Sequence, residues 1–323
     1  MQNQIMPRKV LVISEIHPAG IAELKKCAVV DKRIGLSSEE LLELIPQYDG
    51  VVLRSGIDHL KKDARILEAG RRGQLRVVGL AQTGTDNVNI ETAEQLGIEV
   101  FNSNTNDVST AEFVFGVMFG LARNIIAAQQ ALLNGHWEKR HGPLLGIELK
   151  GKTLGIIGLG NIGQKVAERA QVFGMEIIAY NRNRERVEAL ARERGYTLLS
   201  LEELLEKSDI ITLHISLEEE TNNLINAAAI DRMKETAFII NCARGGIVNE
   251  ADLLKALESD QIAGAALDVF VNEPLPEDSP LREFAGRSNK LCLSPHLGSG
   301  THEAQRKVAI DVAGKICEYL CSL

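Results

Sequence analysis

The stretch GKTLGIIGLGNIGQKVAERAQVFG, residues 151–174, decides the fold class of the chain. Its apolar run 154–158 is predicted to be a β-strand, and the periodic apolar residues that follow predict a helix. Between strand and helix lie three glycines in the spacing G-x-G-x-x-G, at Gly158, Gly160 and Gly163. A strand that turns into a helix through this motif is the context in which the motif binds a dinucleotide.

Each glycine of this turn is expected to have its own role. Gly158 permits the tight turn, Gly160 lets a pyrophosphate approach the backbone, and Gly163 allows the helix to pack closely on the strand. The N–H groups at the start of the helix then face the phosphates. A second strand, predicted at 176–180, completes the context. We therefore predict a dinucleotide-binding unit of the Rossmann type rather than a merely structural turn.

Short β-branched runs alternate with helical patterns along most of the chain. Strands are predicted at 9–13, 50–54, 75–81, 98–101, 154–158, 176–180, 209–214, 237–241, 262–270 and 290–296, with long helical patterns at about 110–133 and 301–319. Strands that are apolar on both faces and separated by helices are typical of parallel sheets covered on each side. The sequence therefore predicts two open α/β domains.

The composition limits the class of protein. The 323 residues are 45% hydrophobic and 25% charged, with a formal net charge of -8. This length favours two domains. A negatively charged chain is not expected to bind nucleic acid or an anionic membrane, because both require a cationic surface. No unbroken apolar segment approaches about 18 residues, so no membrane span is expected.

The cysteines and the amino terminus indicate the compartment. The five cysteines are odd in number and contain no C-x-x-C pair, which favours reduced thiols that serve in packing. They are Cys27, Cys242, Cys292, Cys317 and Cys321. The apolar run near the amino terminus is too short for a signal peptide. We expect a cytoplasmic protein, and nothing in the sequence indicates a metal site.

The end of the second strand of the Rossmann unit departs from the usual pattern. A carboxylate about twenty positions beyond the first glycines normally accepts hydrogen bonds from the adenosine ribose of NAD. Here that place reads Tyr180, Asn181 and Arg182. Asparagine does not repel a 2′-phosphate, and arginine adds a cation. We therefore expect Asn181 and Arg182 in the cofactor site, with NADPH accepted and slightly favoured over NADH.

Three side chains follow predicted strands at their carboxyl ends, where open α/β sheets bind ligands. They are Arg244, Glu273 and His296. An arginine can pair with a carboxylate in bidentate geometry, and a histidine can exchange a hydroxyl proton near neutral pH. A glutamate beside the imidazole would orient it and favour the imidazolium. Each residue alone is more commonly an ion pair, a turn or a structural histidine, but together they suit a 2-hydroxy acid.

The chain resembles the D-isomer-specific 2-hydroxyacid dehydrogenases, and most closely their phosphoglycerate dehydrogenase branch. The resemblance rests on motifs in the family's order: GTDNVNIETAEQLGIEVFN, STAEFVFGVMFGLAR, GKTLGIIGLGNIG, INCARGGIVNE, ALDVFVNEP and SPHLGSGTHEAQ. It implies a Rossmann dinucleotide-binding domain at 104–296, inserted in a flavodoxin-like substrate-binding domain made of 1–103 and 297–323. It also implies a substrate cleft between these domains and a homodimer formed through 104–150.

The resemblance assigns roles to individual residues. Arg244 and the backbone at Thr83 and Gly84 would bind the substrate carboxylate, and His296 would exchange the hydroxyl proton. Glu273 would hold His296 and raise its pKa. The cofactor contacts that the resemblance implies, besides Asn181 and Arg182, are Gly158, Gly160, Asn161, Ile162, Gly163, Thr110, Thr221, Cys242, Ala243, Gly298 and, at the nicotinamide carboxamide, Asp268.

The substrate is less narrowly defined by the sequence. Arg54 matches a position that phosphoglycerate dehydrogenases use near the substrate phosphate, and Lys139 and Arg140 could supply further cations, although Arg54 could equally be an exposed arginine that closes a strand. We expect interconversion of 3-phosphoglycerate and phosphohydroxypyruvate. One alternative is a glyoxylate or hydroxypyruvate reductase, and a second is a non-catalytic, NAD(H)-sensing protein similar to a co-repressor.

One further departure from the family pattern and one expected absence affect these expectations. Ser216 stands where the family usually has a proline near the adenine, which affects the expected adenine contacts. From the resemblance, a chain of this length is expected to be a short form without the serine-sensing domain that longer phosphoglycerate dehydrogenases carry. We therefore expect no regulation by serine through such a domain.

Overall fold

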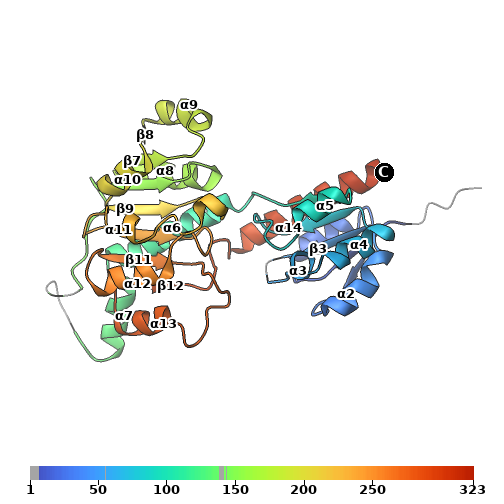
Figure 1. The fold of residues 1–323 in the computed structure, drawn as a ribbon, viewed down its shortest axis with the longest axis horizontal. Helices are drawn as coiled ribbons and strands as arrows, with labels where there is room; N and C mark the ends of the chain where they lie inside the picture. Colours follow the sequence, from blue (N-terminus) through green and yellow to red (C-terminus); the bar gives the residue numbers. More distant parts are fainter. Residues whose placement is uncertain (1–6, 55, 138–141, 143) are drawn as a thin grey trace, which may run out of the picture. The chain divides into compact units, whose positions relative to one another are not determined.

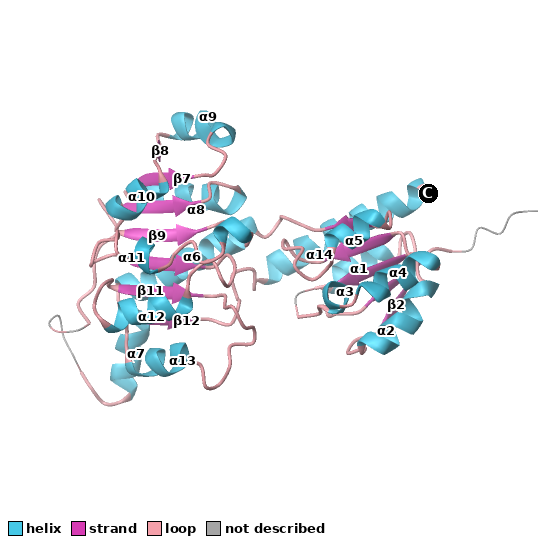
Figure 2. Cartoon of the chain, in the orientation of Figure 1, coloured by secondary structure: helices cyan, strands magenta, loops and turns pink. Residues whose placement is uncertain are grey.

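The computed structural model describes residues 7–54, 56–137, 142 and 144–323. The chain divides into two compact units, one formed by Met1–Asn106 with Gly300–Leu323 and the other by Asp107–Ser299. Each unit is a parallel β-sheet with helices on both faces (Figures 1 and 2). The predicted fold class, two open parallel α/β domains, is confirmed.

The first unit contains a 5-stranded sheet in the order β2-β1-β3-β4-β5. Its strands are β1 (Lys9–Val12), β2 (Val29–Lys32), β3 (Gly50–Leu53), β4 (Val77–Leu80) and β5 (Glu99–Phe101), and its helices are α1 (Pro18–Leu24), α2 (Ser38–Leu44), η1 (Ile45–Gln47), α3 (His59–Lys62), α4 (Ala64–Arg72), α5 (Ile90–Gln95) and α14 (His302–Ser322). Every residue of β3 and β4 is buried. One hydrophobic cluster lies under α2 and α4, and another lies under α1 and α14.

The second unit contains a 7-stranded sheet in the order β12-β11-β10-β9-β6-β7-β8. Its elements are α6 (Asp107–Ala122), α7 (Ile125–Leu133), β6 (Thr153–Ile157), α8 (Asn161–Val172), β7 (Glu176–Tyr180), α9 (Glu185–Arg194), β8 (Thr197–Leu198), α10 (Leu201–Lys207), β9 (Ile210–Leu213), η2 (Glu219–Thr221), α11 (Ala227–Ile230), β10 (Phe238–Asn241), α12 (Glu250–Glu258), β11 (Gly264–Leu267), α13 (Pro280–Arg287) and β12 (Leu291–Leu293). The strand order reverses between β6 and β9, which makes this the switch point where such sheets bind ligands.

The register of the second sheet brings its strand ends to one level. The last residues of neighbouring strands are paired across the sheet in the row Tyr180, Ile157, Leu213, Asn241, Leu267 and Leu293. Side chains that directly follow these residues therefore emerge along a single edge. This row positions most of the predicted site.

Two edge strands and one helix break were not predicted. The strands β2 and β8 lie at sheet edges, and none of their residues is fully buried, so they lack the apolar signal of the central strands. The helix predicted at 110–133 is two helices, α6 and α7, separated by Asn124 in the left-handed region (φ 51°). Among the described residues no single helix could cross a membrane; the pair α6 and α7 would reach the necessary length and composition only jointly, and it bends by 57°.

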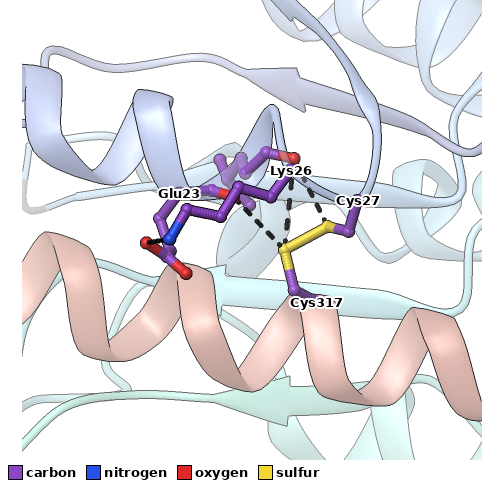
Figure 3. The surroundings of a disulfide bond; sticks show 5 residues. Glu23, Lys26, Cys27 and Cys317 are labelled. Atoms are coloured by element: carbon purple, nitrogen blue, oxygen red, sulfur yellow. Dashed lines mark hydrogen bonds and ion pairs between the residues drawn. A yellow bond between two sulfur atoms is a disulfide. The ribbon is translucent and has the colours of Figure 1, made fainter.

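A disulfide joins the two ends of the first unit. It links Cys27, just after α1, to Cys317 in α14, across a sequence separation of 290 residues and a Cα–Cα distance of 5.5 Å (Figure 3). The two helices approach closely because Gly20 has no side chain; a Cβ there would lie 2.8 Å from the Cβ of Ala309. The expectation of reduced thiols is wrong for this pair, because no local spacing announces a bridge between opposite ends of a sequence.

The other cysteines follow the expectation in part. Cys242 and Cys292 are buried free thiols, as packing predicts, whereas Cys321 is free and exposed. Cys321 lies in the last turn of the same helix as Cys317. It therefore offers a matched control for substitution of the bridged cysteine.

Replacement of Cys317 by serine should destabilise the first unit only under oxidising conditions. A disulfide that closes a long loop restricts the unfolded chain and stabilises the fold by about 2–4 kcal/mol. We expect the thermal midpoint of the Cys317→Ser variant to fall by several degrees without reductant and to equal that of the reduced wild type with reductant. Cys321→Ser should have no such effect. A wild-type midpoint that does not respond to reductant, together with five titratable thiols, would contradict the bridge.

Candidate active site

The Gly-rich turn joins β6 to α8, and each of its glycines meets a different environment. Gly158 has φ +97°, and a Cβ there would lie 2.5 Å from the carbonyl oxygen of His214. A Cβ at Gly163 would lie 2.1 Å from the carbonyl oxygen of Gly158, so glycine is required for α8 to pack this closely. A Cβ at Gly160 would meet nothing within 4 Å, which leaves open space beside the turn.

The start of α8 offers hydrogen-bond donors to an anion. Gly160 is the N-cap, and no side chain of a described residue caps the helix. The N–H groups of Asn161, Ile162 and Gly163 thus have no side-chain acceptor in the described part of the chain, and the helix dipole adds a partial positive charge there. His214 lies beside the turn, and burial lowers the pKa of its imidazole to about 3, so it is neutral near neutral pH.

At the end of β7, Asn181 stands in place of the usual carboxylate and binds the Gly-rich turn itself. Its Oδ1 accepts a hydrogen bond from the backbone N–H of Leu159 at 3.2 Å. The next residue, Arg182, forms an ion pair with Glu218 at 2.6 Å and a longer one with Glu220 at 3.7 Å. The predicted ribose site therefore contains an uncharged amide and an arginine that is already paired with carboxylates.

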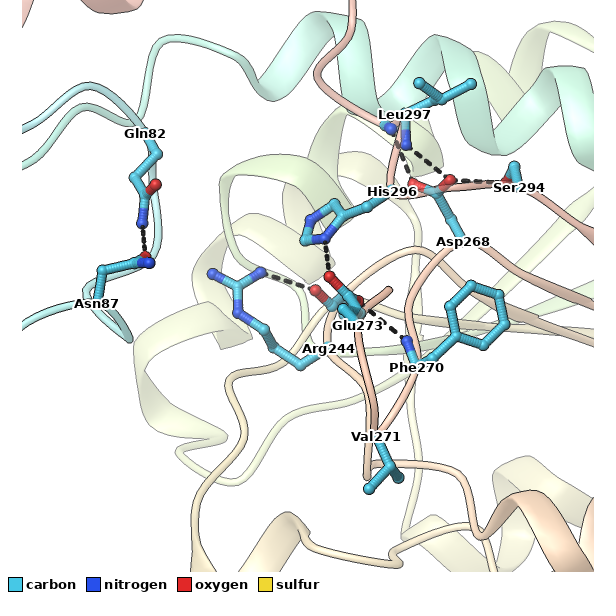
Figure 4. Close-up of polar contacts among 12 residues, drawn as sticks. Gln82, Asn87, Arg244, Asp268, Phe270, Val271, Glu273, Ser294, His296 and Leu297 are labelled. Carbon is cyan, nitrogen blue, oxygen red and sulfur yellow. Dashed lines mark hydrogen bonds and ion pairs between the residues drawn. The ribbon is translucent and has the colours of Figure 1, made fainter. Parts of the chain in front are cut away.

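The imidazole of His296 and the carboxylate of Glu273 form the centre of the site (Figure 4). The Nδ1 atom of His296 lies 2.8 Å from Oε2 of Glu273, and Oε1 of Glu273 accepts a hydrogen bond from the backbone N–H of Phe270 at 3.0 Å. Both carboxylate oxygens are thus engaged. Because Nδ1 faces Glu273, Nε2 is the ring nitrogen that can exchange a proton with a ligand.

The carboxylate of Asp268 holds the loop that carries His296. Asp268 is 1% exposed and accepts hydrogen bonds from Ser294 Oγ at 2.6 Å and from the N–H groups of Leu297 and Gly298, both at 2.8 Å (Figure 4). The backbone N–H of His296 donates to the carbonyl oxygen of Asp268 at 2.8 Å. These bonds stabilise His296 at φ +55°, a conformation that residues other than glycine rarely adopt.

Arg244 lies on a loop after β10 that a second buried side chain organises. Asn241, 1% exposed, donates from Nδ2 to the carbonyl oxygen of Arg244 at 2.9 Å and accepts at Oδ1 from Ala243 N at 3.0 Å. Gly245 follows, and a Cβ there would lie 1.9 Å from the carbonyl oxygen of Phe270, so the loop packs against the segment that leads to Glu273. Arg244 therefore follows the end of β10, next to β11, and its loop lies beside the segment that carries Glu273.

The side chains of His296 and Glu273 shift each other's pKa. The hydrogen bond to Glu273 raises the pKa of His296 above its ordinary value of 6.5, although burial opposes the shift. Burial raises the pKa of Glu273, but hydrogen bonds from His296 and Phe270 and the positive charges of His296 and Arg244 outweigh it, so the pKa of this carboxyl falls below 4.5. Near neutral pH Glu273 is ionised and His296 is poised to gain or lose a proton.

The first unit carries the remaining predicted residues at the carboxyl ends of β3 and β4. Arg54 directly follows β3, and burial lowers the pKa of its guanidinium. No carboxylate pairs with it among the described residues. Thr83 and Gly84 follow β4, and their loop is held by Gln82, whose Nε2 donates to Gly84 O at 2.9 Å and to Asn87 Oδ1 at 2.6 Å (Figure 4).

The structure brings most predicted residues of the second unit to the row of strand ends. Thr110, in α6, lies beside Gly298, where a Cβ would be 3.4 Å from its Cγ2 atom. The predicted cofactor contacts at this edge are Gly158, Gly160, Asn161, Ile162, Gly163, Asn181, Arg182, Thr110, Cys242, Ala243, Asp268 and Gly298, while Thr221 ends the helix η2. Arg54, Thr83 and Gly84 belong to the other unit. Lys139 and Arg140 lie outside the described residues.

Sequence reasoning missed residues that position the site. Asn241 and Ser294 act through hydrogen bonds inside their loops, and Glu218 and Glu220 act on Arg182. A polar residue at the end of an otherwise apolar strand was a signal for Asn241. Only the fold could reveal the partners of the two glutamates.

Comparison with known proteins shows which family the chain is similar to. Residues 115–298 match the model of the D-isomer specific 2-hydroxyacid dehydrogenase NAD binding domain. A D-3-phosphoglycerate dehydrogenase from Synechocystis sp. is 44% identical over 98% of this chain and 54% of its own length. The chain thus spans about half the length of this relative and of similar ones from Methanocaldococcus jannaschii and Archaeoglobus fulgidus.

Two further relatives match over nearly their whole length. A hydroxypyruvate reductase from Thermotoga maritima is 40% identical over 88% of this chain and 89% of that protein. The crystal structure of a glyoxylate reductase from Paecilomyes thermophila has a TM-score of 0.84 at 28% identity, covering 98% of this chain and 96% of that one.

The pKa of His296 should depend on the carboxylate of Glu273. We expect the imidazole of His296, followed by NMR and assigned with a His296→Gln variant, to titrate above 6.5. In Glu273→Gln the stabilising negative charge is lost, so the titration should move to lower pH. Glu277→Gln, which removes a charge from the same exposed loop, is the matched control. An unchanged pKa in Glu273→Gln would show that the pair does not form.

Proposed function

The chain belongs to the D-isomer specific 2-hydroxyacid dehydrogenase family, and we propose that it is an NAD(P)-dependent enzyme that moves a hydride between nicotinamide and C2 of a small 2-hydroxy acid. The observation that carries the proposal is the His296–Glu273 pair at 2.8 Å, on the same edge of the sheet as an open Gly-rich turn. A proton exchanger beside a dinucleotide site is what oxidation of an alcohol requires.

The residues divide the work of the reaction. Arg244 pairs with the substrate carboxylate, and during reduction the Nε2 atom of protonated His296 gives its proton to the 2-oxo oxygen. In oxidation the neutral imidazole takes the hydroxyl proton. Glu273 keeps Nδ1 protonated and compensates the positive charge that forms on the ring. The nicotinamide, when bound, supplies or accepts the hydride.

We assign the cofactor to the unit Asp107–Ser299, close to the expected 104–296, and the substrate-binding role to the other unit. The Gly-rich turn supports the first assignment. Arg54, Thr83 and Gly84, at strand ends of the other unit, support the second. A cytoplasmic location is part of the same proposal and agrees with the metabolic reactions named for the relatives.

A homodimer through 104–150 is also proposed. The helix α7 has no buried residue, and exposed apolar side chains gather on it and just after it. They include Ile125, Ile126, Leu132, Leu133 and Trp137, with Trp137 74% exposed. Large apolar side chains that remain exposed in one copy favour burial against a second.

The proposed substrate is 3-phosphoglycerate, or phosphohydroxypyruvate in the reverse direction. Arg54 supports this choice, because a half-buried cation without a carboxylate partner in the described chain favours an anionic ligand. The hydroxyl of Ser14, two residues beyond the end of the adjacent strand β1, is buried and has no hydrogen-bond partner among the described residues, so we assign it to the same anion. The alternatives, hydroxypyruvate and glyoxylate, are the substrates named for two of the relatives.

For the cofactor, the family match supports NAD(H) in general, and we propose that NADPH is accepted and slightly favoured. The support is Asn181, whose amide occupies the end of β7 without negative charge, and the neighbouring cation Arg182. A 2′-phosphate would find no carboxylate at position 181.

The proposed reaction is tested by steady-state reduction of phosphohydroxypyruvate, hydroxypyruvate and glyoxylate with NADH and NADPH. We expect turnover that falls by about 10²- to 10⁴-fold in His296→Gln, because proton transfer is lost. His302→Gln, at the exposed start of α14, should behave as the wild type. Cofactor binding without turnover, unaffected by His296→Gln, would instead support the nucleotide-sensing protein.

The substrate proposal predicts a selective effect of Arg54→Gln. Loss of one charged contact to a phosphate should raise KM for phosphohydroxypyruvate by about 10- to 100-fold, while KM for hydroxypyruvate changes less than about threefold. Arg72→Gln, on the exposed face of α4, is the control. Equal effects on both substrates would place Arg54 away from the phosphate.

A further inference from the structure

An acidic segment competes for the arginine beside the proposed ribose site. Arg182 Nη1 lies 2.6 Å from Glu218 Oε2 and 3.7 Å from Glu220 Oε2. Both glutamates follow β9, the strand on the opposite side of β6 from β7. The hydrogen bond and charge of Glu218 are the leading causes that raise the pKa of Arg182. The arginine that the sequence offered to a phosphate is therefore already neutralised.

The backbone presents Glu218 at a defined place. Its N–H donates to Thr221 Oγ1 at 2.7 Å, and that hydroxyl donates to the carbonyl oxygen of Ser216 at 2.7 Å. Glu218 and Thr221 thus form a capping box at the start of η2. Thr221, expected to contact the cofactor, fixes the turn from which the carboxylate of Glu218 reaches Arg182.

The position of Asn181 ties this arrangement to the cofactor site. Its amide binds the Gly-rich turn at Leu159 N, so the residue that follows lies at the adenosine end of the turn. A 2′-phosphate placed there would need the guanidinium of Arg182 and would be repelled by Glu218 and Glu220. A ribose with a free 2′-hydroxyl would neither need the guanidinium nor be repelled by the two carboxylates.

We propose that Glu218, assisted by Glu220, is a specificity-determining residue that holds Arg182 and limits the preference for NADPH over NADH. This inference rests on the proposed cofactor site. All three side chains are well exposed, with fractions of 65% for Arg182, 44% for Glu218 and 73% for Glu220. Ion pairs in such positions are weak, so the arginine can be released by a competing phosphate or by removal of one carboxylate.

The test is the ratio of kcat/KM with NADPH to that with NADH. In Glu218→Gln this ratio should rise by about three- to tenfold, because Arg182 is released and a repulsive charge is removed. Glu219→Gln, the same change at the neighbouring exposed residue, should leave the ratio within about twofold. In an Arg182→Gln background the effect of Glu218→Gln should shrink to about twofold, since only the repulsion remains. An unchanged ratio, or the same increase in both backgrounds, would overturn the inference.

Binding of 2′,5′-ADP and 5′-AMP, measured by calorimetry without substrate, separates this inference from the proposed function. Glu218→Gln should strengthen binding of 2′,5′-ADP relative to 5′-AMP, and salt should reduce the difference from the wild type. Asn181→Asp, which keeps an acceptor for Leu159 N–H but adds a charge, should weaken 2′,5′-ADP selectively. If Asn181→Asp acts and Glu218→Gln does not, the inference alone fails. If neither nucleotide binds, the proposed cofactor site fails with it.

Discussion

The arrangement of the candidate site depends on the buried carboxylate of Asp268. It is 1% exposed and accepts hydrogen bonds from Ser294, Leu297 and Gly298, which flank His296 in the sequence. A carboxylate can be buried at little cost only where hydrogen-bond donors replace its water, and here the donors belong to the loop itself. The same carboxylate thereby stabilises the left-handed backbone of His296 at φ +55°. The position of the imidazole thus depends on the hydrogen bonds that the loop donates to this one carboxylate.

Sheet register does the rest of the positioning in the second unit. Because neighbouring strands end at one level, short loops suffice to bring Arg244, Glu273 and His296 to the same edge as the Gly-rich turn. Two of these loops are braced by buried polar side chains, Asn241 and Asp268. The groups proposed to react therefore lie on irregular segments that rigid strands and hydrogen-bonded polar side chains support.

Much of this was predictable from the sequence, and the exceptions have physical reasons. The buried strands and the glycines at 158, 160 and 163 carry local patterns. Arg244, Glu273 and His296 follow predicted strands at their carboxyl ends, and the family resemblance supplied the roles proposed for them. The edge strands β2 and β8 lack the apolar signal. The Cys27–Cys317 bridge and the Arg182–Glu218 pair depend on contacts between distant segments, which no spacing records. The sequence indicated a free cation for a 2′-phosphate, whereas in the structure that cation is already paired.

The proposed function depends on hydride transfer between the nicotinamide and C2 of a 2-hydroxy acid at this edge of the sheet. The most direct measurement uses reduced cofactor that carries deuterium at C4 of the nicotinamide, with phosphohydroxypyruvate or hydroxypyruvate as the acceptor. We expect deuterium at C2 of a product with the D configuration. A product without deuterium at C2 from either labelled face of the cofactor, or no product from any of the proposed 2-oxo acids, would contradict it.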